Sequence, residues 1–106
     1  PLLGYRNAVE CFIRLHEVDS SQLSDDRAYT LPNTTYSLHE MIAALERVAT
    51  KHEIALGPVN DKPDPVIQKI VATWPTATDS SRGLALGLPN DVSLDQVVED
   101  YIADFL

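Results

Sequence analysis

Apolar residues recur along most of the chain with the spacing of amphipathic helices. In residues 5–17, Val9, Phe12, Ile13 and His16 stand at i, i+3, i+4 and i+7, which places them on one helical face. A short helix is also expected from Asp79 through Leu86, so the pattern predicts about five helices in all. The three other apolar stripes are Leu38, Met41, Ile42, Leu45 and Val48, then Val66, Ile67, Ile70, Val71 and Trp74, and finally Leu94, Val97, Val98, Tyr101, Ile102 and Phe105.

Start and stop signals bound these predicted helices. Ser37 and Glu40 have the spacing of a capping box, in which each side chain caps the backbone amide of the other residue, and they precede a helix expected at 38–50. Proline ends a helix, so Pro75 is expected to stop the third helix after Trp74, with Trp74 in the core. The remaining signals are Ser93 with Gln96, Asp64 with Pro65, Asp79, and Gly87.

Two short segments, residues 27–32 and 54–56, have the pattern of strands; the first ends at Pro32 and the second is closed by Gly57 and Pro58. Two short strands do not make a stable sheet alone, so we expect them to lie against helices or against strands supplied from elsewhere. The expected fold class is therefore α+β but mostly helical, with about five helices and two short strands, in a single domain of residues 1–106.

Composition narrows the class of protein. The chain has 106 residues, 44% of them hydrophobic and 23% charged, which is ordinary for one globular domain. Its net charge is −8, and the 8 Lys and Arg residues form no basic run, so binding to nucleic acid or to an anionic membrane surface is not expected. One cysteine, Cys11, makes no internal disulfide, and a cytoplasmic protein is the expectation.

The sequence shows none of the compact motifs of catalysis or cofactor binding. The three histidines and Cys11 lack the spacing of metal ligands. Gly4, Gly57, Gly83 and Gly87 are scattered and make no Gly-x-Gly-x-x-Gly turn, which a dinucleotide site needs so that the backbone can approach the pyrophosphate. We therefore expect this chain to bind no metal and no cofactor by itself.

Several stretches together resemble one family. Residues 79–88, DSSRGLALGL, followed by SLDQVV at 93–98, are similar to the C-terminal signature of extended short-chain dehydrogenases and sugar-nucleotide epimerases, although Gly83 stands where that family usually has Ala. With IQKIVATWP at 67–75, RAYTLP at 27–32 and EMIAAL at 40–45, the chain resembles the D-erythronate dehydrogenase branch of the NAD-dependent epimerase/dehydratase family. This resemblance covers nearly the whole chain.

The resemblance implies a fragment. Members of the family carry an N-terminal Rossmann domain that binds NAD or NADP, and a catalytic Tyr-x-x-x-Lys pair. Here the residues four positions after the tyrosines are Val9, Asn33, Glu40 and Phe105, and the chain begins with Pro1 instead of Met. We therefore expect the small C-terminal substrate-binding lobe of an oxidoreductase, inactive without its Rossmann domain, which would be its partner. The parent's substrate would be a small sugar acid or hydroxy acid.

One site residue follows from the same resemblance. The family has a Ser-Pro-Arg segment near the substrate, and the matching residues here are Gly4, Tyr5 and Arg6. Arg6 is therefore expected to bind the substrate, since a guanidinium suits a carboxylate through paired hydrogen bonds. No catalytic, cofactor-binding or metal-binding residue is expected.

Two other functions stay open at this point. One is a fragment of a nucleotide-sugar epimerase or dehydratase, which shares the fold. The other is a non-enzymatic acidic helical module that binds a basic partner. We also expect an apolar face for the absent domain, through which isolated copies would form a homo-oligomer.

Overall fold

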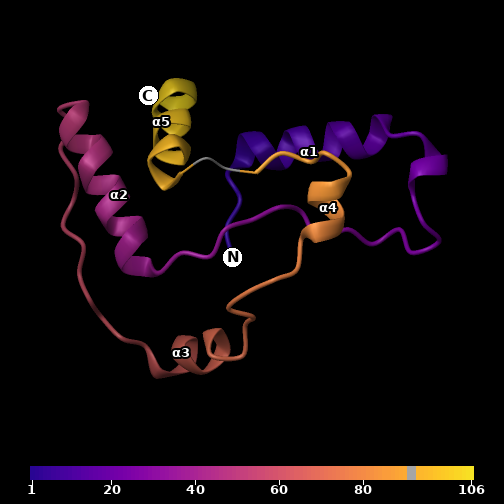
Figure 1. Cartoon of the computed structure of the whole chain (residues 1–106). Helices are drawn as coiled ribbons and strands as arrows, with labels where there is room; N and C mark the ends of the chain where they lie inside the picture. The colour runs from indigo at the N-terminus through magenta and orange to yellow at the C-terminus, as the bar shows by residue number, and fades with distance from the viewer. Residues whose placement is uncertain (91–92) are drawn as a thin grey trace.

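The computed structural model describes residues 1–90 and 93–106, and it consists of helices joined by long extended segments (Figure 1). The prediction of about five helices is confirmed in this part of the chain. They are α1 (Tyr5–Glu17), α2 (Leu38–Lys51), α3 (Pro65–Val71), α4 (Ser81–Ala85) and α5 (Leu94–Phe105), with a 3₁₀ turn, η1 (Ser20–Gln22), after α1.

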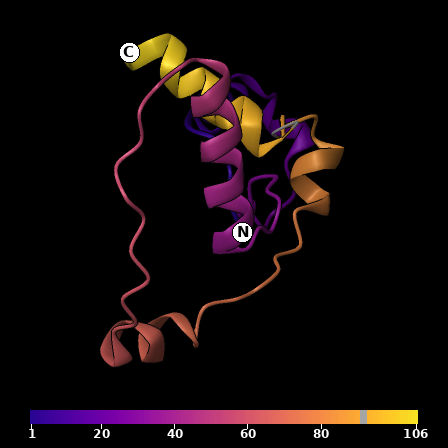
Figure 2. The ribbon, with the colours of Figure 1, turned by 90° about the vertical axis from the view of Figure 1, so that its left-hand side faces the viewer.

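The helices form a thin, open arrangement. α2 packs along α5, α4 lies against α1, and α3 stands apart on a long excursion of the chain (Figures 1 and 2). The molecule extends 50 × 35 × 17 Å. Because a helix with its side chains is about 10–12 Å across, the shortest dimension leaves room for little more than one layer of helices. None of the described helices is long and apolar enough to cross a membrane.

The predicted capping signals act as expected at most helix ends. The capping box of α2 is reciprocal, because the Ser37 hydroxyl accepts from the Glu40 amide while the Glu40 carboxylate accepts from the Ser37 amide. α3 begins with the Asp64 side chain accepting from the amides of Val66 and Ile67. At the end of α4, Gly87 has a φ of +82°, which glycine adopts without the steric cost of a Cβ.

The third helix is shorter than predicted. It ends at Val71, and the amides of Thr73 and Trp74 turn back to carbonyls three residues earlier. The residue before a proline is disfavoured in the helical region, which explains why the helix does not reach Trp74 before Pro75. The Trp74 side chain is 63% exposed, so the expected core position is wrong.

Neither predicted strand forms in the described part of the chain. The described residues contain one isolated antiparallel bridge, between Leu2 and Thr34, outside both predicted segments. Residues 27–32 are extended but lie against α4, where the Ala28 carbonyl accepts from Arg82 instead of from a neighbouring strand. Residues 54–56 lead into the exposed excursion to α3. Both segments have strand-like sequences, but a strand needs a second backbone to pair with.

The buried core is small and is made mainly of short side chains. It centres on Ala44, Val48 and Ala49 of α2, with Cys11 of α1 and Leu88 after α4. The stripe predicted for α1 does not lie in it, because Val9, Phe12 and Ile13 are 56%, 65% and 47% exposed. The buried residue of α1 is instead Cys11, whose thiol lies 3.6 Å from the Pro89 carbonyl oxygen.

Ion pairs lie along the seam between α2 and α5. Arg47 pairs with Asp95 at 2.5 Å, and Lys51 and His52 both reach Glu99 at 2.6 Å. Hydrogen bonds from Arg47 and Lys51 lower the pKa values of Asp95 and Glu99, respectively. Because Arg47 and Lys51 are exposed and their acidic partners are only partly buried, each pair adds little to stability, and the pairs mainly set the register of the two helices.

Gly83 allows the closest approach between α4 and the rest of the chain. A Cβ atom at this position would lie 2.8 Å from the Thr30 carbonyl oxygen and 3.3 Å from a ring carbon of Pro32, which is buried. Glycine fits at position 83 because residues 27–32 pass directly over the α4 backbone.

We expect Gly83→Ala to destabilise the fold by up to about 2 kcal/mol, because overpacking costs about 1–3 kcal/mol and is only partly offset by the roughly 1 kcal/mol gained in helix propensity. Urea unfolding followed by circular dichroism measures this difference. Gly57→Ala is the matched control, since its Cβ would meet nothing within 4 Å, and it should leave stability equal or higher by about 0.4–1 kcal/mol. Equal stability of the two variants would contradict the close approach at Gly83.

Candidate functional site

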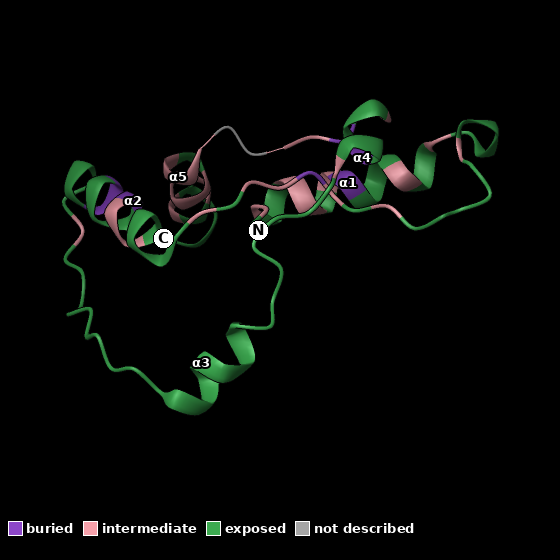
Figure 3. Cartoon of the chain, turned by 60° about the horizontal axis from the view of Figure 1, so that its bottom comes forward, coloured by how far each residue is buried: buried purple, intermediate pink, exposed green. Residues whose placement is uncertain are grey.

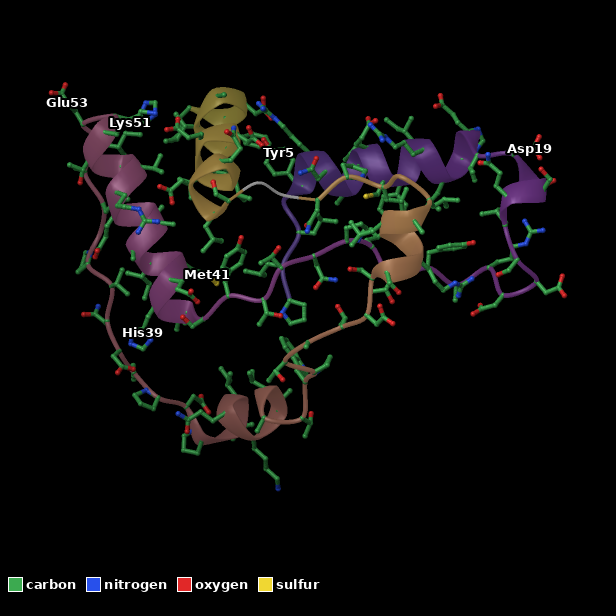
Figure 4. All side chains as sticks on the ribbon, viewed as in Figure 1. Tyr5, Asp19, His39, Met41, Lys51 and Glu53 are labelled. Carbon is green, nitrogen blue, oxygen red and sulfur yellow. The ribbon has the colours of Figure 1, made fainter. Side chains whose placement is uncertain are left out.

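Arg6, the predicted substrate-binding residue, lies in the first turn of α1, where Gly4 is the N-cap and offers no capping side chain. This end of α1 is next to α5, as the position of Tyr5 shows (Figure 4). Residues near the two ends of the chain are thereby brought together, although they lie more than ninety positions apart in the sequence.

The guanidinium of Arg6 is held by two carboxylates of α5. Its Nε and Nη2 donate to the two oxygens of Asp104 at 2.9 and 2.6 Å, and Nη1 donates to Asp100 at 2.7 Å. Nη2 also lies 3.4 Å from the Asp100 carbonyl oxygen. The paired bonds to Asp104 are the geometry in which arginine recognises a carboxylate most strongly. Arg6 therefore already holds, within this chain, the kind of group that a hydroxy-acid substrate would offer.

Tyr5 completes this cluster. Its hydroxyl donates to the Asp104 carboxylate and lies 3.0 Å from the Asp100 carbonyl oxygen, and its ring lies tilted against Phe105 with centroids 5.6 Å apart. The hydrogen bonds from Arg6 and Tyr5 lower the pKa of Asp104 to about 2. Desolvation and the bond to Asp104 raise the pKa of Tyr5, so this hydroxyl stays protonated at neutral pH.

The hydrogen bonds of Arg6 to Asp100 and Asp104 limit its capacity to bind a ligand. Four of the five N–H groups of Arg6 are engaged by Asp100 and Asp104, so among the described residues one N–H of Nη1 is left for a ligand. A substrate carboxylate would have to use this donor or displace one of the two aspartates. The role of Arg6 in substrate binding therefore stays a prediction.

An apolar pocket that was not predicted from the sequence lies close to the Arg6 cluster. It has a volume of about 420 Å³, is open to solvent on one side, and is lined by residues of the N-terminal segment, α2 and α5. Apart from the Tyr36 hydroxyl, its lining side chains offer no polar group, so it does not suit a small charged acid. The apolar stripes of α2 and α5 are visible in the sequence. The sequence does not show which sides of these two helices face each other. The lining residues are Leu2, Leu3, Gly4, Tyr36, Leu38, Met41, Ile42, Ala44, Leu45, Leu94, Val97 and Val98.

The described residues do not fit a nicotinamide cofactor. Gly57 lies in an exposed extended segment, and Gly83 and Gly87 belong to the short helix α4 and its end. Gly4 is the N-cap of α1, but among the described residues it follows an isolated bridge instead of a strand, and no second glycine follows at the Gly-x-Gly-x-x-Gly spacing that holds a dinucleotide pyrophosphate. In the same part of the chain, no group of three or more His, Cys, Asp or Glu side chains is arranged to hold a metal ion.

We expect Asp104→Asn to reduce the loss of stability in acid. A carboxyl group has an unfolded pKa near 4, and that of folded Asp104 is about 2. Its contribution is therefore present above about pH 4 and is lost as the pH falls through about 2. Urea unfolding at a series of pH values should show Asp104→Asn to be less stable than wild type at neutral pH, with a shallower decline below pH 4.

Asp61→Asn is the control for this experiment, since Asp61 lies in the exposed segment before α3. It should follow the wild-type profile. If Asp104→Asn also followed that profile, the ion pair between α1 and α5 would not form in solution.

Comparison with known proteins finds two relatives of this chain. It is 34% identical over 103 residues to a D-erythronate dehydrogenase of Cupriavidus necator, a match that covers 97% of this chain and 31% of that protein. A D-erythronate dehydrogenase of Haemophilus influenzae is 30% identical over 91 residues, which covers 86% of this chain and 28% of that protein. No protein-family model matches the chain, and no solved structure does.

The chain thus spans less than a third of the length of these relatives. The match covers 97% of this chain, and it confirms the resemblance stated from the sequence motifs. This chain is therefore a homologue of the D-erythronate dehydrogenases over almost all of its own length and about 31% of theirs.

Proposed function

We propose that this chain is the substrate-side lobe of an NAD(P)-dependent oxidoreductase that acts on a small sugar acid or hydroxy acid. The observation that carries this proposal is the 34% identity to a D-erythronate dehydrogenase over 103 of the 106 residues. Homologues named as dehydrogenases support an oxidoreductase parent. The lobe itself would bind substrate and would perform no chemistry.

The chemistry of a dehydrogenase explains why a further domain is proposed. Oxidation of a hydroxyl group needs a base that removes its proton and a nicotinamide that accepts its hydride. The described residues present neither a dinucleotide turn nor a Tyr-x-x-x-Lys pair. We propose that a Rossmann domain supplies both, and the greater length of the relatives supports this division of labour. The lobe would close one wall of the active site and exclude water from it.

Arg6 is the proposed contact for the substrate carboxylate. The Arg6 side chain is 44% exposed, and one N–H of its guanidinium is not bonded to the described carboxylates. The Asp100 carboxylate accepts one hydrogen bond from Arg6, whereas the Asp104 carboxylate accepts a pair. A substrate carboxylate would therefore take the place of Asp100 while Asp104 continues to orient the arginine. The Tyr5 hydroxyl supports this arrangement by binding the same Asp104 carboxylate.

The experiment uses the longest reading frame that contains this sequence, expressed with NAD or NADP and assayed on D-erythronate and other short hydroxy acids. We expect oxidation of a sugar acid by the longer protein and none by the 106-residue chain. Arg6→Ala should raise KM for the acid at least about tenfold, since a hydrogen bond to a charged group contributes roughly 1.5–3 kcal/mol, with a smaller change in kcat. Arg6→Lys should lie between the two.

Arg27→Ala is the matched control because it removes an exposed arginine from another segment, and its KM should equal that of wild type. Thermal unfolding of each variant separates lost binding from lost folding. Turnover of a nucleotide sugar instead of an acid, or the absence of any nicotinamide-dependent activity, would overturn the proposal. An unchanged KM for Arg6→Ala would remove Arg6 from the site.

A further inference from the structure

The Arg6 cluster, made of Tyr5, Arg6, Asp100 and Asp104, holds more negative than positive charge. The Arg6 guanidinium bonds to the carboxylates of both aspartates, so two negative charges face one positive charge. Asp104 accepts the paired bonds of Arg6 and a further bond from the Tyr5 hydroxyl. Within the cluster, the charge of Asp100 is therefore the one that remains in excess.

Among the described residues, no second cation is bonded to this cluster. Helix α5 carries four acids and no base. Arg47 and Lys51, the bases of α2 that reach α5, are bonded to Asp95 and Glu99. The cluster also lies in the C-terminal half of α5, and the C-terminal end of a helix carries a partial negative charge. An anion that approaches Arg6 therefore meets a negative potential from α5.

Asp100 is the more shielded of the two carboxylates that hold Arg6. Its side chain is 19% exposed, compared with 36% for Asp104. The first half of α5 is mostly half-buried (Figure 3). Salt screens a partly buried charge less than an exposed one. The charge of Asp100 therefore acts more strongly on a ligand at Arg6 than the charge of a fully exposed aspartate would.

Gln96 keeps the Asp100 carboxylate in place when a ligand replaces it on Arg6. The Gln96 side-chain amide donates to Asp100 Oδ1 at 2.8 Å, and the same oxygen accepts from Arg6 Nη1. Residues four apart on a helix are neighbours on its surface. A substrate carboxylate that takes the place of Asp100 on Nη1 would thus leave Asp100 bonded to Gln96, with its negative charge beside the bound acid.

The neighbouring apolar pocket offers no counter-charge for a second anionic group. Gly4, two residues before Arg6, lines this pocket, and none of the residues that line it is charged. Coulomb interactions are stronger where apolar groups replace water. A second negative charge on the ligand would therefore gain no partner on this side of the cluster, and it would be repelled by Asp100.

We propose that Asp100 is a specificity-determining residue, which restricts the Arg6 site to acids with a single negative charge. Each charge of a ligand is repelled by Asp100, so an acid with two charges is disfavoured more than an acid with one. This inference rests on the proposed function, because it requires Arg6 to bind the substrate carboxylate. It narrows the class of substrate to monocarboxylic hydroxy acids.

The test uses the longer protein and two ligands that differ by one charge. The first is D-erythronate, assayed by its KM. The second is meso-tartrate, which has the same carbon skeleton with a carboxylate at each end and is assayed by its inhibition constant. Wild type should bind meso-tartrate more weakly than D-erythronate.

Asp100→Asn removes the charge but keeps an oxygen that accepts from Arg6 and Gln96. We expect this variant to lower the KM for D-erythronate about fivefold, which is the effect of a unit charge at about 4 Å in a water-like dielectric. The inhibition constant of meso-tartrate should fall at least about tenfold, because both of its charges are relieved of repulsion. The ratio of the two constants therefore shifts toward the dicarboxylate.

Asp95→Asn is the matched control, because it removes an aspartate from the same helix and releases another arginine, Arg47. Both constants should equal those of wild type. Asp100→Glu keeps the negative charge, and it should keep the wild-type ratio of the two constants. Circular dichroism checks that each variant is folded.

An equal change in both constants for Asp100→Asn, or no change in either, would overturn this inference, because discrimination by charge must alter their ratio. Tighter binding of meso-tartrate than of D-erythronate by wild type would also overturn it. If Arg6→Ala still raised the KM for D-erythronate in these cases, the proposed function would stand. Absence of oxidation by the wild-type protein would overturn the proposed function and this inference together.

Discussion

The dominant constraint on this structure is that one layer of helices cannot bury both of its faces. The molecule is 17 Å across in its shortest dimension, and its buried core is limited to a few small side chains near α2, α1 and the end of α4. Small residues such as Ala44 and Ala49 allow helices to approach closely but bury little area. The exposed stripes on α1 and α3 and the open apolar pocket all follow from this constraint.

Polar contacts between helices define much of the helix arrangement that a larger core would otherwise determine. Arg6 and Tyr5 tie the start of α1 to the end of α5, and Arg47 and Lys51 bridge α2 to α5. These bonds are directional, so they define which helix faces which, whereas their exposure limits what they add to stability. They place α5 between α1 and α2, and they thereby form both the cluster around Arg6 and the apolar pocket beside it.

The candidate site is consistent with a lobe that works as part of something larger. An arginine at a helix start, oriented by a paired carboxylate, is suited to recognise an acid, but a hydride transfer needs groups that the described residues do not contain. The relatives that the chain matches are named D-erythronate dehydrogenases and are about three times as long. The Arg6 prediction came from a family motif, whereas Asp100, Asp104 and Tyr5 emerged from tertiary contacts across the chain.

Local sequence determined the helices, because caps and turns act over a few residues: the Ser37 box, Asp64 before Pro65 and Gly87 all act at their predicted places. Family motifs also identified the relatives. The tertiary structure decided which faces are buried, so the α1 stripe and Trp74 point outward and residues 27–32 lie against α4 at Gly83. Burial and strand pairing depend on what lies opposite a segment, and helical periodicity contains no information about that neighbour.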